Sequence, residues 1–301
     1  MIRAVTVTNH MDESITFDLV NPEKSGFYIR EITGLGPPKA NINTTEMATS
    51  DGSIYNSARA MSRNIVLTLG FLFMPDIESV RQLSYKYFPL KKRIKLTVQA
   101  DHRTGATYGY VESNEPDIFS NQQTTQISVI CPDPHFYAPG KSMTSFTGVT
   151  ALFEFPFSNE SLTKDLIEFG EMSSGPLKPV HYDGDTEIGV TIFIDVFGEV
   201  SDITIYEPET NRRMVISEAK LAMLTGSGLT EGDQLIITTM RGDKGITLIR
   251  EGVSYNVLNA LNRDAFWFKL TRGSNLFAYT ADSGLAFLDF RIENGVAYEG
   301  M

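Results

Sequence analysis

The 301-residue sequence has little that would cross-link the fold or anchor it in a membrane. It contains a single cysteine, Cys131, so an internal disulfide is excluded and packing alone must hold the fold. Its longest apolar runs, such as residues 71–74, are far shorter than the ~20 residues of a membrane-spanning helix. Residues 1–14 also lack the apolar core of a secretory signal, and we therefore expect a soluble protein that is made in a cytoplasm.

Positive charge is scarce as well. The chain has 26 Lys and Arg against 37 Asp and Glu, a net charge of −11 at pH 7. Because proteins that wrap duplex DNA draw most of their affinity from neutralised phosphates, this balance disfavours that class. A hydrophobic fraction of 42% with 11% aromatic residues is enough to build cores, so a chain that is disordered throughout is excluded. The length indicates two domains, or one large domain.

The residue patterns that carry catalysis or hold cofactors are also missing. The four histidines, at positions 10, 102, 135 and 181, are far apart, and none has a second His or Cys at metal-ligand spacing. Cys131 follows an apolar run and precedes a proline, which indicates a buried thiol at a strand end and not a nucleophile. No Gly-x-Ser-x-Gly, P-loop or Gly-x-Gly-x-x-Gly pattern follows a strand. We therefore expect no enzyme activity, no cofactor, and no catalytic, cofactor-binding or metal-binding residues.

Four short features have both a structural and a functional interpretation. The Asp-Gly-Asp at 183–185 resembles the start of a calcium loop, but the later ligand positions do not follow, which favours a polar turn. The Arg-Gly-Asp at 241–243 matches a cell-adhesion triplet, yet a hairpin turn is expected there. Trp267 lies between two phenylalanines and could stack on a sugar ring, although burial is more common for tryptophan. The basic cluster at 91–93 is either a solvated turn or a contact for an acidic patch on a neighbouring subunit.

The dominant hydrophobic period is two, which is typical of strands. Strands are predicted at 4–7, 15–19, 64–69, 94–98, 126–130, 189–197, 203–206, 213–216, 235–239, 245–250, 266–270, 276–279 and 285–292. Apolar residues at helical spacing between Pro75 and Pro89 predict a single helix over 76–87. Residues 41–56 show little periodicity and predict a long polar loop, either a floppy surface loop or a partner-binding arm.

Three prolines between 132 and 139 mark a domain boundary, and the strands after 189 are evenly spaced with tight turns. We predict a mainly-β, two-domain protein. Residues 1–140 form a sandwich or barrel-like domain with one helix, and residues 141–292 form an antiparallel β-sandwich. The segment 293–301 contains a short apolar run, which favours packing back onto the first domain over a frayed end.

The order of several segments makes a resemblance visible. In the first half, Gly-Leu-Gly-Pro-Pro at 34–38 leads into a polar segment that ends at Asp51-Gly52. A strand with Arg63 to Leu67, one helix and the Cys131 to Tyr137 segment follow. The second half has the Asp-Gly-Asp turn, Glu-Gly-Asp-Gln-Leu at 231–235 and Arg-Gly-Ser-Asn at 272–275 before a final strand. In this order, over nearly the whole chain, the sequence resembles the distal tail proteins of siphophages.

The resemblance implies a homo-hexameric ring of amino-terminal domains around an axial channel, with a galectin-like sandwich projecting outward from each subunit. It implies a structural role at the tail tip or baseplate of a phage or tail-like particle, assembled in the bacterial host cytoplasm. The implied partners are the tail tube protein and the tail-associated hub protein, with tape-measure and receptor-binding proteins as further partners. Specific nucleic-acid or membrane binding is not implied. The alternative is a carbohydrate-binding adhesin module that contacts the host cell wall.

Overall fold

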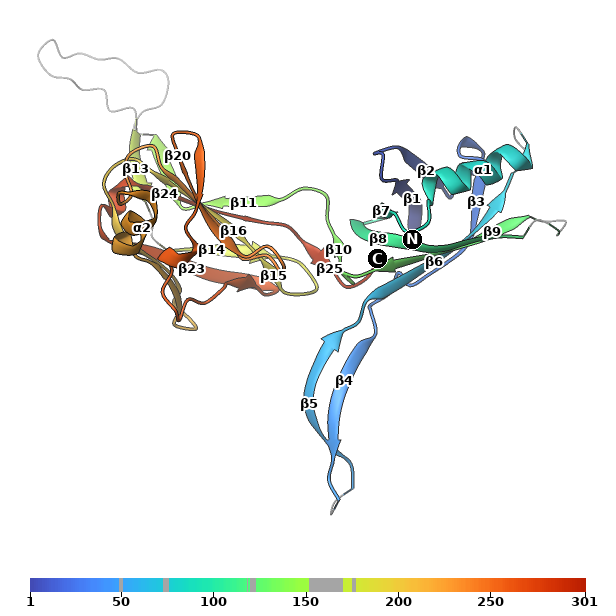
Figure 1. The fold of residues 1–301 in the computed structure, drawn as a ribbon, viewed down its shortest axis with the longest axis horizontal. Helices are drawn as coiled ribbons and strands as arrows, with labels where there is room; N and C mark the ends of the chain where they lie inside the picture. Colours follow the sequence, from blue (N-terminus) through green and yellow to red (C-terminus); the bar gives the residue numbers. More distant parts are fainter. Residues whose placement is uncertain (49–50, 73–75, 118, 120–122, 152–169, 175–176) are drawn as a thin grey trace, which may run out of the picture. The chain divides into compact units, whose positions relative to one another are not determined.

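The computed structural model describes residues 1–48, 51–72, 76–117, 119, 123–151, 170–174 and 177–301. The chain forms two compact units, which we call unit 1 (residues 1–140 and 297–301) and unit 2 (residues 141–296). Both units are mainly β-strand, so the predicted fold class is confirmed (Figure 1). In the described residues, no helix is long and apolar enough to cross a membrane.

In its described residues, unit 1 contains one α-helix and strands that pair antiparallel. Its elements are β1 (Ile2–Thr8), β2 (Ser14–Asp18), β3 (Phe27–Thr33), β4 (Ala40–Glu46), β5 (Ser53–Ala60), β6 (Arg63–Phe71), α1 (Ile77–Tyr87), β7 (Arg93–Ala100), β8 (Thr104–Pro116), β9 (Thr124–Cys131), β10 (Phe136–Tyr137) and β25 (Ala297–Tyr298), with a 3₁₀ turn at Pro22–Lys24. The main sheet has the order β2-β1-β7-β8-β9-β6-β3, and β10 pairs with both β8 and β25.

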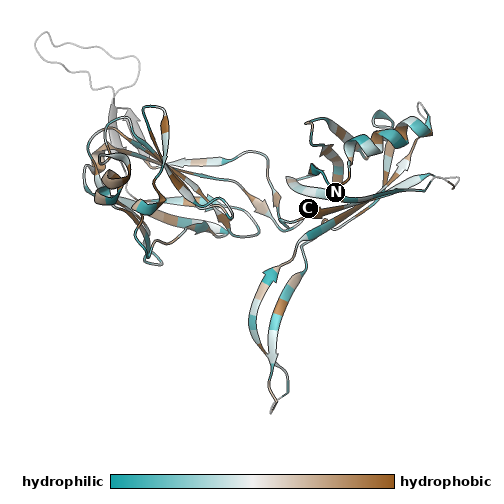
Figure 2. Cartoon of the chain, viewed as in Figure 1, coloured by the Kyte–Doolittle hydropathy of each residue, from teal (hydrophilic) through white to brown (hydrophobic). Residues whose placement is uncertain are grey.

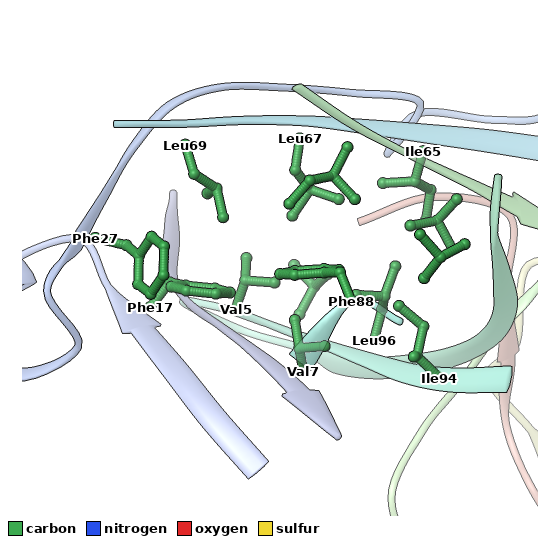
Figure 3. Packing of buried hydrophobic residues seen from close by; sticks show 14 of the residues in the cluster. Val5, Val7, Phe17, Phe27, Ile65, Leu67, Leu69, Phe88, Ile94 and Leu96 are labelled. Atoms are coloured by element: carbon green, nitrogen blue, oxygen red, sulfur yellow. The ribbon is translucent and has the colours of Figure 1, made fainter. Parts of the chain in front are cut away.

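The core of unit 1 follows from alternation along these strands. Every second residue of β1, β6, β7 and β9 points inward, and these side chains meet in one buried cluster (Figure 3). Helix α1 begins where the sequence predicts it, because the Asp76 carboxylate accepts a hydrogen bond from the Ser79 backbone amide at 2.8 Å. The helix contributes Val80 to the cluster, and Phe88 follows directly after it.

Unit 2 is built from two larger sheets and several short pairs. Its elements are β11 (Ser142–Ser145), β12 (Thr147–Ala151), β13 (Gly170–Ser174), β14 (Leu177–Tyr182), β15 (Ile188–Gly189), β16 (Thr191–Val196), β17 (Ser201–Glu207), β18 (Arg212–Ile216), α2 (Glu218–Thr225), β19 (Gln234–Thr238), β20 (Gly245–Arg250), β21 (Val253–Asn256), β22 (Lys269–Leu270), β23 (Gly273–Ser283) and β24 (Leu288–Asn294), with 3₁₀ turns at Leu258–Ala260 and Leu285–Phe287.

The two larger sheets of unit 2 pack face to face. One has the order β11-β24-β16-β19-β20-β21 and the other β14-β23-β17-β18. The ring of Tyr279 in β23 stacks on the ring of Phe290 in β24 with centroids 4.6 Å apart. Phe146 meets Phe290 edge to face at 4.9 Å, and all three side chains are buried. The alternating strands of unit 2 therefore form an antiparallel sandwich.

Several predicted elements differ from the structure. Residues 41–56 were expected to form a loop, but 41–46 and 53–56 belong to the paired strands β4 and β5. Of the strand predicted at 266–270, only Lys269–Leu270 is extended, and residues 285–287 form a 3₁₀ turn before β24. The helix predicted over 76–87 is confirmed as α1, whereas helix α2 of unit 2 was not predicted.

Candidate interaction surface: the arm and its base

Strands β4 and β5 form a hairpin that we call the arm (residues 40–60). They pair with each other from Ala40↔Ala60 to Glu46↔Ser53, and in the described structure with no other strand. Figure 1 shows the arm extending beyond the unit 1 sheet from the ends of β3 and β6. Every described residue from 39 to 62 is exposed. The arm therefore contributes nothing to the core of unit 1.

An isolated two-stranded hairpin is marginally stable in water, and its two outer edges present unpaired amide and carbonyl groups. The arm also exposes apolar side chains on a mostly polar ribbon (Figure 2). Ile42 is 60% exposed, Ile54 53% and Tyr55 63%. The described residues of unit 1 offer no partner for these groups. This combination is typical of a segment that becomes ordered against another surface.

Arg63 lies at the base of the arm, as the first residue of β6, and is only 3% exposed. Its Nε donates to the Pro134 carbonyl at 2.7 Å. Its Nη1 donates to the carbonyls of Gly34 at 2.6 Å and Gly36 at 2.5 Å, and its Nη2 donates to that of Glu299. A planar guanidinium with five donors suits this task, because it can reach acceptors on three separate segments at once.

All four acceptors of Arg63 are backbone carbonyls, and its guanidinium lies 4.5 Å above the centre of the Phe136 ring. Burial lowers the pKa of Arg63 below its ordinary value. Gly34 is required beside it: its φ is +83°, and an added Cβ would lie 2.1 Å from the Asn64 carbonyl oxygen. Arg63 thus joins the segment before the arm, the segment that leads to unit 2 and the segment that returns from it. We call this group the Arg63 node.

The returning segment is held in unit 1 by more than this arginine. Strand β25 pairs with β10 through Phe136↔Tyr298 and Tyr137↔Ala297. The Met301 amide donates to the Leu35 carbonyl at 3.0 Å. The returning segment was expected to begin at 293, but residues 293 and 294 still belong to β24, where they pair with β11. It begins at 297 because the sheet of unit 2 uses the residues before it.

Deleting residues 297–301 should lower the free energy of unfolding of unit 1 by roughly 2–4 kcal/mol. The deletion removes β25 and leaves Arg63 with one acceptor fewer. Urea unfolding followed by circular dichroism measures the loss. Glu299→Ala is the control: it keeps the backbone carbonyl and should change stability by less than about 0.5 kcal/mol. An unchanged unfolding midpoint for the deletion would show that the segment is only a frayed end.

A second surface of unit 1 lies on strands β7 and β8, and we call it the β7–β8 patch (Lys91, Lys92, Arg93, Lys95, Tyr108 and Tyr110). Arg93 faces Tyr110 and Lys95 faces Tyr108 across the two strands. The Arg93 guanidinium lies 4.0 Å from the centre of the Tyr108 ring, and both tyrosines are nearly half exposed. No ion pair of the described residues involves these four cations.

Two of the candidate residues for metal binding or nucleophilic chemistry lie beside the Arg63 node: Cys131 pairs with Arg63 across strands β9 and β6, and His135 lies between Pro134 and Phe136. The structure does not bring the histidines together: His135 Nδ1 lies 3.0 Å from Asp133 Oδ1, and His181 Nε2 lies 2.9 Å from an oxygen of exposed Asp183. Among the described residues, no three His, Cys, Asp or Glu side chains form a group that could hold a metal ion. Cys131 is buried, and burial raises the pKa of its thiol to about 11, so its interpretation as a core thiol is confirmed.

The two remaining motifs of unit 2 are the Arg-Gly-Asp triplet and Trp267. The Arg-Gly-Asp at 241–243 forms a turn in which the Asp243 amide donates to the Met240 carbonyl at 3.1 Å, as predicted. Trp267 was expected to be largely buried, but it is only partly so, and the Lys244 ammonium lies 5.4 Å from its ring centre. The buried aromatic residue of this segment is its neighbour, Phe268.

Comparisons with known proteins bear on the fold. No protein-family model and no curated protein sequence matches the chain. The crystal structure of the Dit protein of SPP1, described as a paradigm of the hub adsorption apparatus in phages that infect Gram-positive hosts, matches with a TM-score of 0.64 at 13% identity, covering 97% of this chain and 98% of that one. A chain of the phage P2 baseplate in its activated conformation with Ca matches with a TM-score of 0.47 at 10% identity, covering 98% of both chains. The chain therefore has the fold of SPP1 Dit along nearly its whole length.

Proposed function

We propose that this chain is a structural, non-enzymatic hub protein of a phage tail tip or baseplate. Unit 1 is the ring-forming domain, and six copies close around an axial channel. The ring connects the tail tube to the tail-associated hub protein, and the tape-measure protein contacts it during assembly. Unit 2, a galectin-like sandwich, offers the attachment surface for receptor-binding proteins. The shared fold with SPP1 Dit supports this function.

The arm is the observation that carries the proposal. All its described residues are exposed, and both of its edges are open in the isolated chain. In a closed ring, each copy can cover the arm of its neighbour, so the open edges are removed without leaving one subunit unmatched. A hairpin without a partner would instead be a liability for aggregation. Assembly with further copies therefore accounts for the exposed arm.

Native mass spectrometry and negative-stain microscopy of the purified chain test the proposal. We expect a species of six subunits and ring-shaped particles with six-fold symmetry, formed more completely as the protein concentration rises. Open helical fibres, or a strict monomer at every concentration and salt condition, would contradict it. A monomer that binds cell-wall glycan would favour the adhesin alternative, for which the partly exposed Trp267 is the relevant side chain.

A further inference from the structure

The end of the arm that lies farthest from the sheet is acidic. Glu46 closes strand β4 and Asp51 lies in the turn that follows, and both side chains are exposed. The nearest basic residues, Lys39 and Arg59, lie at the base of the arm, and the sequence between them has no other Lys or Arg. The arm tip (Glu46 and Asp51) therefore carries two negative charges without a neutralising neighbour on the arm.

The arm is long enough to carry this charge to another molecule. Strand β4 has seven residues, and at ~3.3 Å per residue it spans about 20 Å. Apolar side chains accompany the charge, because exposed Ile54 and Tyr55 are the second and third residues of strand β5. A surface that receives the tip must therefore offer positive charge together with apolar or aromatic area.

The β7–β8 patch has both properties. Four cations lie within five consecutive positions of a chain whose net charge is −11. Two tyrosines that are nearly half exposed, Tyr108 and Tyr110, lie opposite Lys95 and Arg93 on the next strand. Glu112 is the acid nearest to the two tyrosines in the sequence and lies on the same strand. Its carboxylate accepts a hydrogen bond from the Ser128 hydroxyl at 2.8 Å. The positive charge of the patch is thus left for a partner.

We infer that the acidic arm tip of one copy docks on the β7–β8 patch of a second copy. The inference rests on the ring proposed above and names the surface that receives the arm. Each copy supplies one tip and one patch, so the contact is heterologous and every site is filled when the ring closes. A patch that instead faced the channel would hold passing DNA through phosphate contacts, which is the opposite of what a channel needs.

Charge reversal tests the contact from both sides. Glu46→Lys/Asp51→Lys reverses the tip, and Lys92→Glu/Arg93→Glu reverses the patch. Each double variant should raise the concentration at which half the protein is assembled by about tenfold or more, measured by sedimentation velocity at low salt. A chain that carries all four substitutions should assemble with a midpoint concentration close to that of the wild type, because the tip and the patch again have opposite charges. The control Glu23→Lys/Glu231→Lys changes the net charge by the same amount as the tip variant, at exposed acids elsewhere, and should leave the assembly midpoint unchanged.

The outcomes separate this inference from the proposed function. If the wild-type chain forms rings and the tip variant forms them equally well, the ring stands and the docking site is wrong. If both reversals fail to assemble and their combination does not recover, the pairing of tip with patch is overturned. If the wild-type chain never forms rings, both the proposed function and the docking of the arm tip on the patch are wrong. Binding of a duplex DNA oligonucleotide that is lost on patch reversal, with assembly unchanged, would make the patch a nucleic-acid surface and would also overturn the inference.

Discussion

Replacing the arm, residues 40–60, with a short Gly-Ser linker should abolish ring assembly while unit 1 remains folded. The ends of the arm are already close, because the Met61 amide donates to the Lys39 carbonyl at 2.9 Å, so a few residues can close the gap. No residue of the arm belongs to the buried cluster of unit 1, and the shorter loop costs little entropy to close. The stability of unit 1 should therefore change by less than about 1 kcal/mol, while the native mass spectrum should contain only monomer.

The matched control for this deletion is Asn41→Ala, which changes an exposed side chain and keeps the strand pairing of the arm. It should assemble as the wild-type chain does. Rings formed by the armless chain, with the same symmetry and at the same concentrations, would show that the arm is not the element that joins the copies. Loss of the folded circular dichroism spectrum would instead show that the arm supports unit 1 itself.

Arg63→Met should destabilise unit 1 by roughly 3–5 kcal/mol. The methionine fills part of the volume but donates no hydrogen bond, so the carbonyls of Gly34, Gly36, Pro134 and Glu299 lose their shared partner in a buried site. Arg63→Lys keeps the charge, but an ammonium has only three donors, all on one atom, in place of four hydrogen bonds from three nitrogens, so we expect an intermediate loss of roughly 2–3 kcal/mol. Chemical denaturation monitored by circular dichroism measures both effects.

Arg59→Met is the comparison for the Arg63 variants. Arg59 lies at the base of the arm and is exposed, so its replacement should alter the free energy of unfolding by no more than about 0.5 kcal/mol. Equal midpoints for Arg63→Met and Arg59→Met would mean that the Arg63 node contributes no net stability. A large loss only for Arg63→Met would assign the stability to the buried hydrogen bonds and not to the positive charge.

The sequence predicts the parts of the fold that bury one face. Strands β6 and β7 can be predicted because their core residues, such as Ile65 and Leu67 in β6, alternate with residues outside the core. The arm is not visible in this way, because both of its faces are exposed and no periodicity is required. Strand β8 is missed for a different reason. Glycine takes some inward positions, and at Gly109 an added Cβ would lie 2.5 Å from Val129 Cγ1, so close packing replaces the hydrophobic signal.

The signals for α2 and for the Arg63 node are present in the sequence but weak. Residues 218–225 are mostly good helix formers, and Gly226 ends the helix in the left-handed conformation, yet only Leu221 is buried. Arg63 is in phase with the buried residues Ile65, Leu67 and Leu69, so an arginine stands where an apolar residue is expected. No local sequence pattern identifies the acceptors of Arg63, because they come from segments up to 236 positions away.

The Arg63 node also sets an order of events during synthesis. Glu299 and its neighbours emerge from the ribosome only after all of unit 2, although their hydrogen-bond partners in unit 1 were made long before. Domains generally fold as units during translation, with the amino-terminal one first. Here the first unit must wait for its last strand, so the base of the arm is completed only after the intervening unit has been made. In the ring proposed above, this order would delay the joining of nascent subunits until the base of each arm is complete.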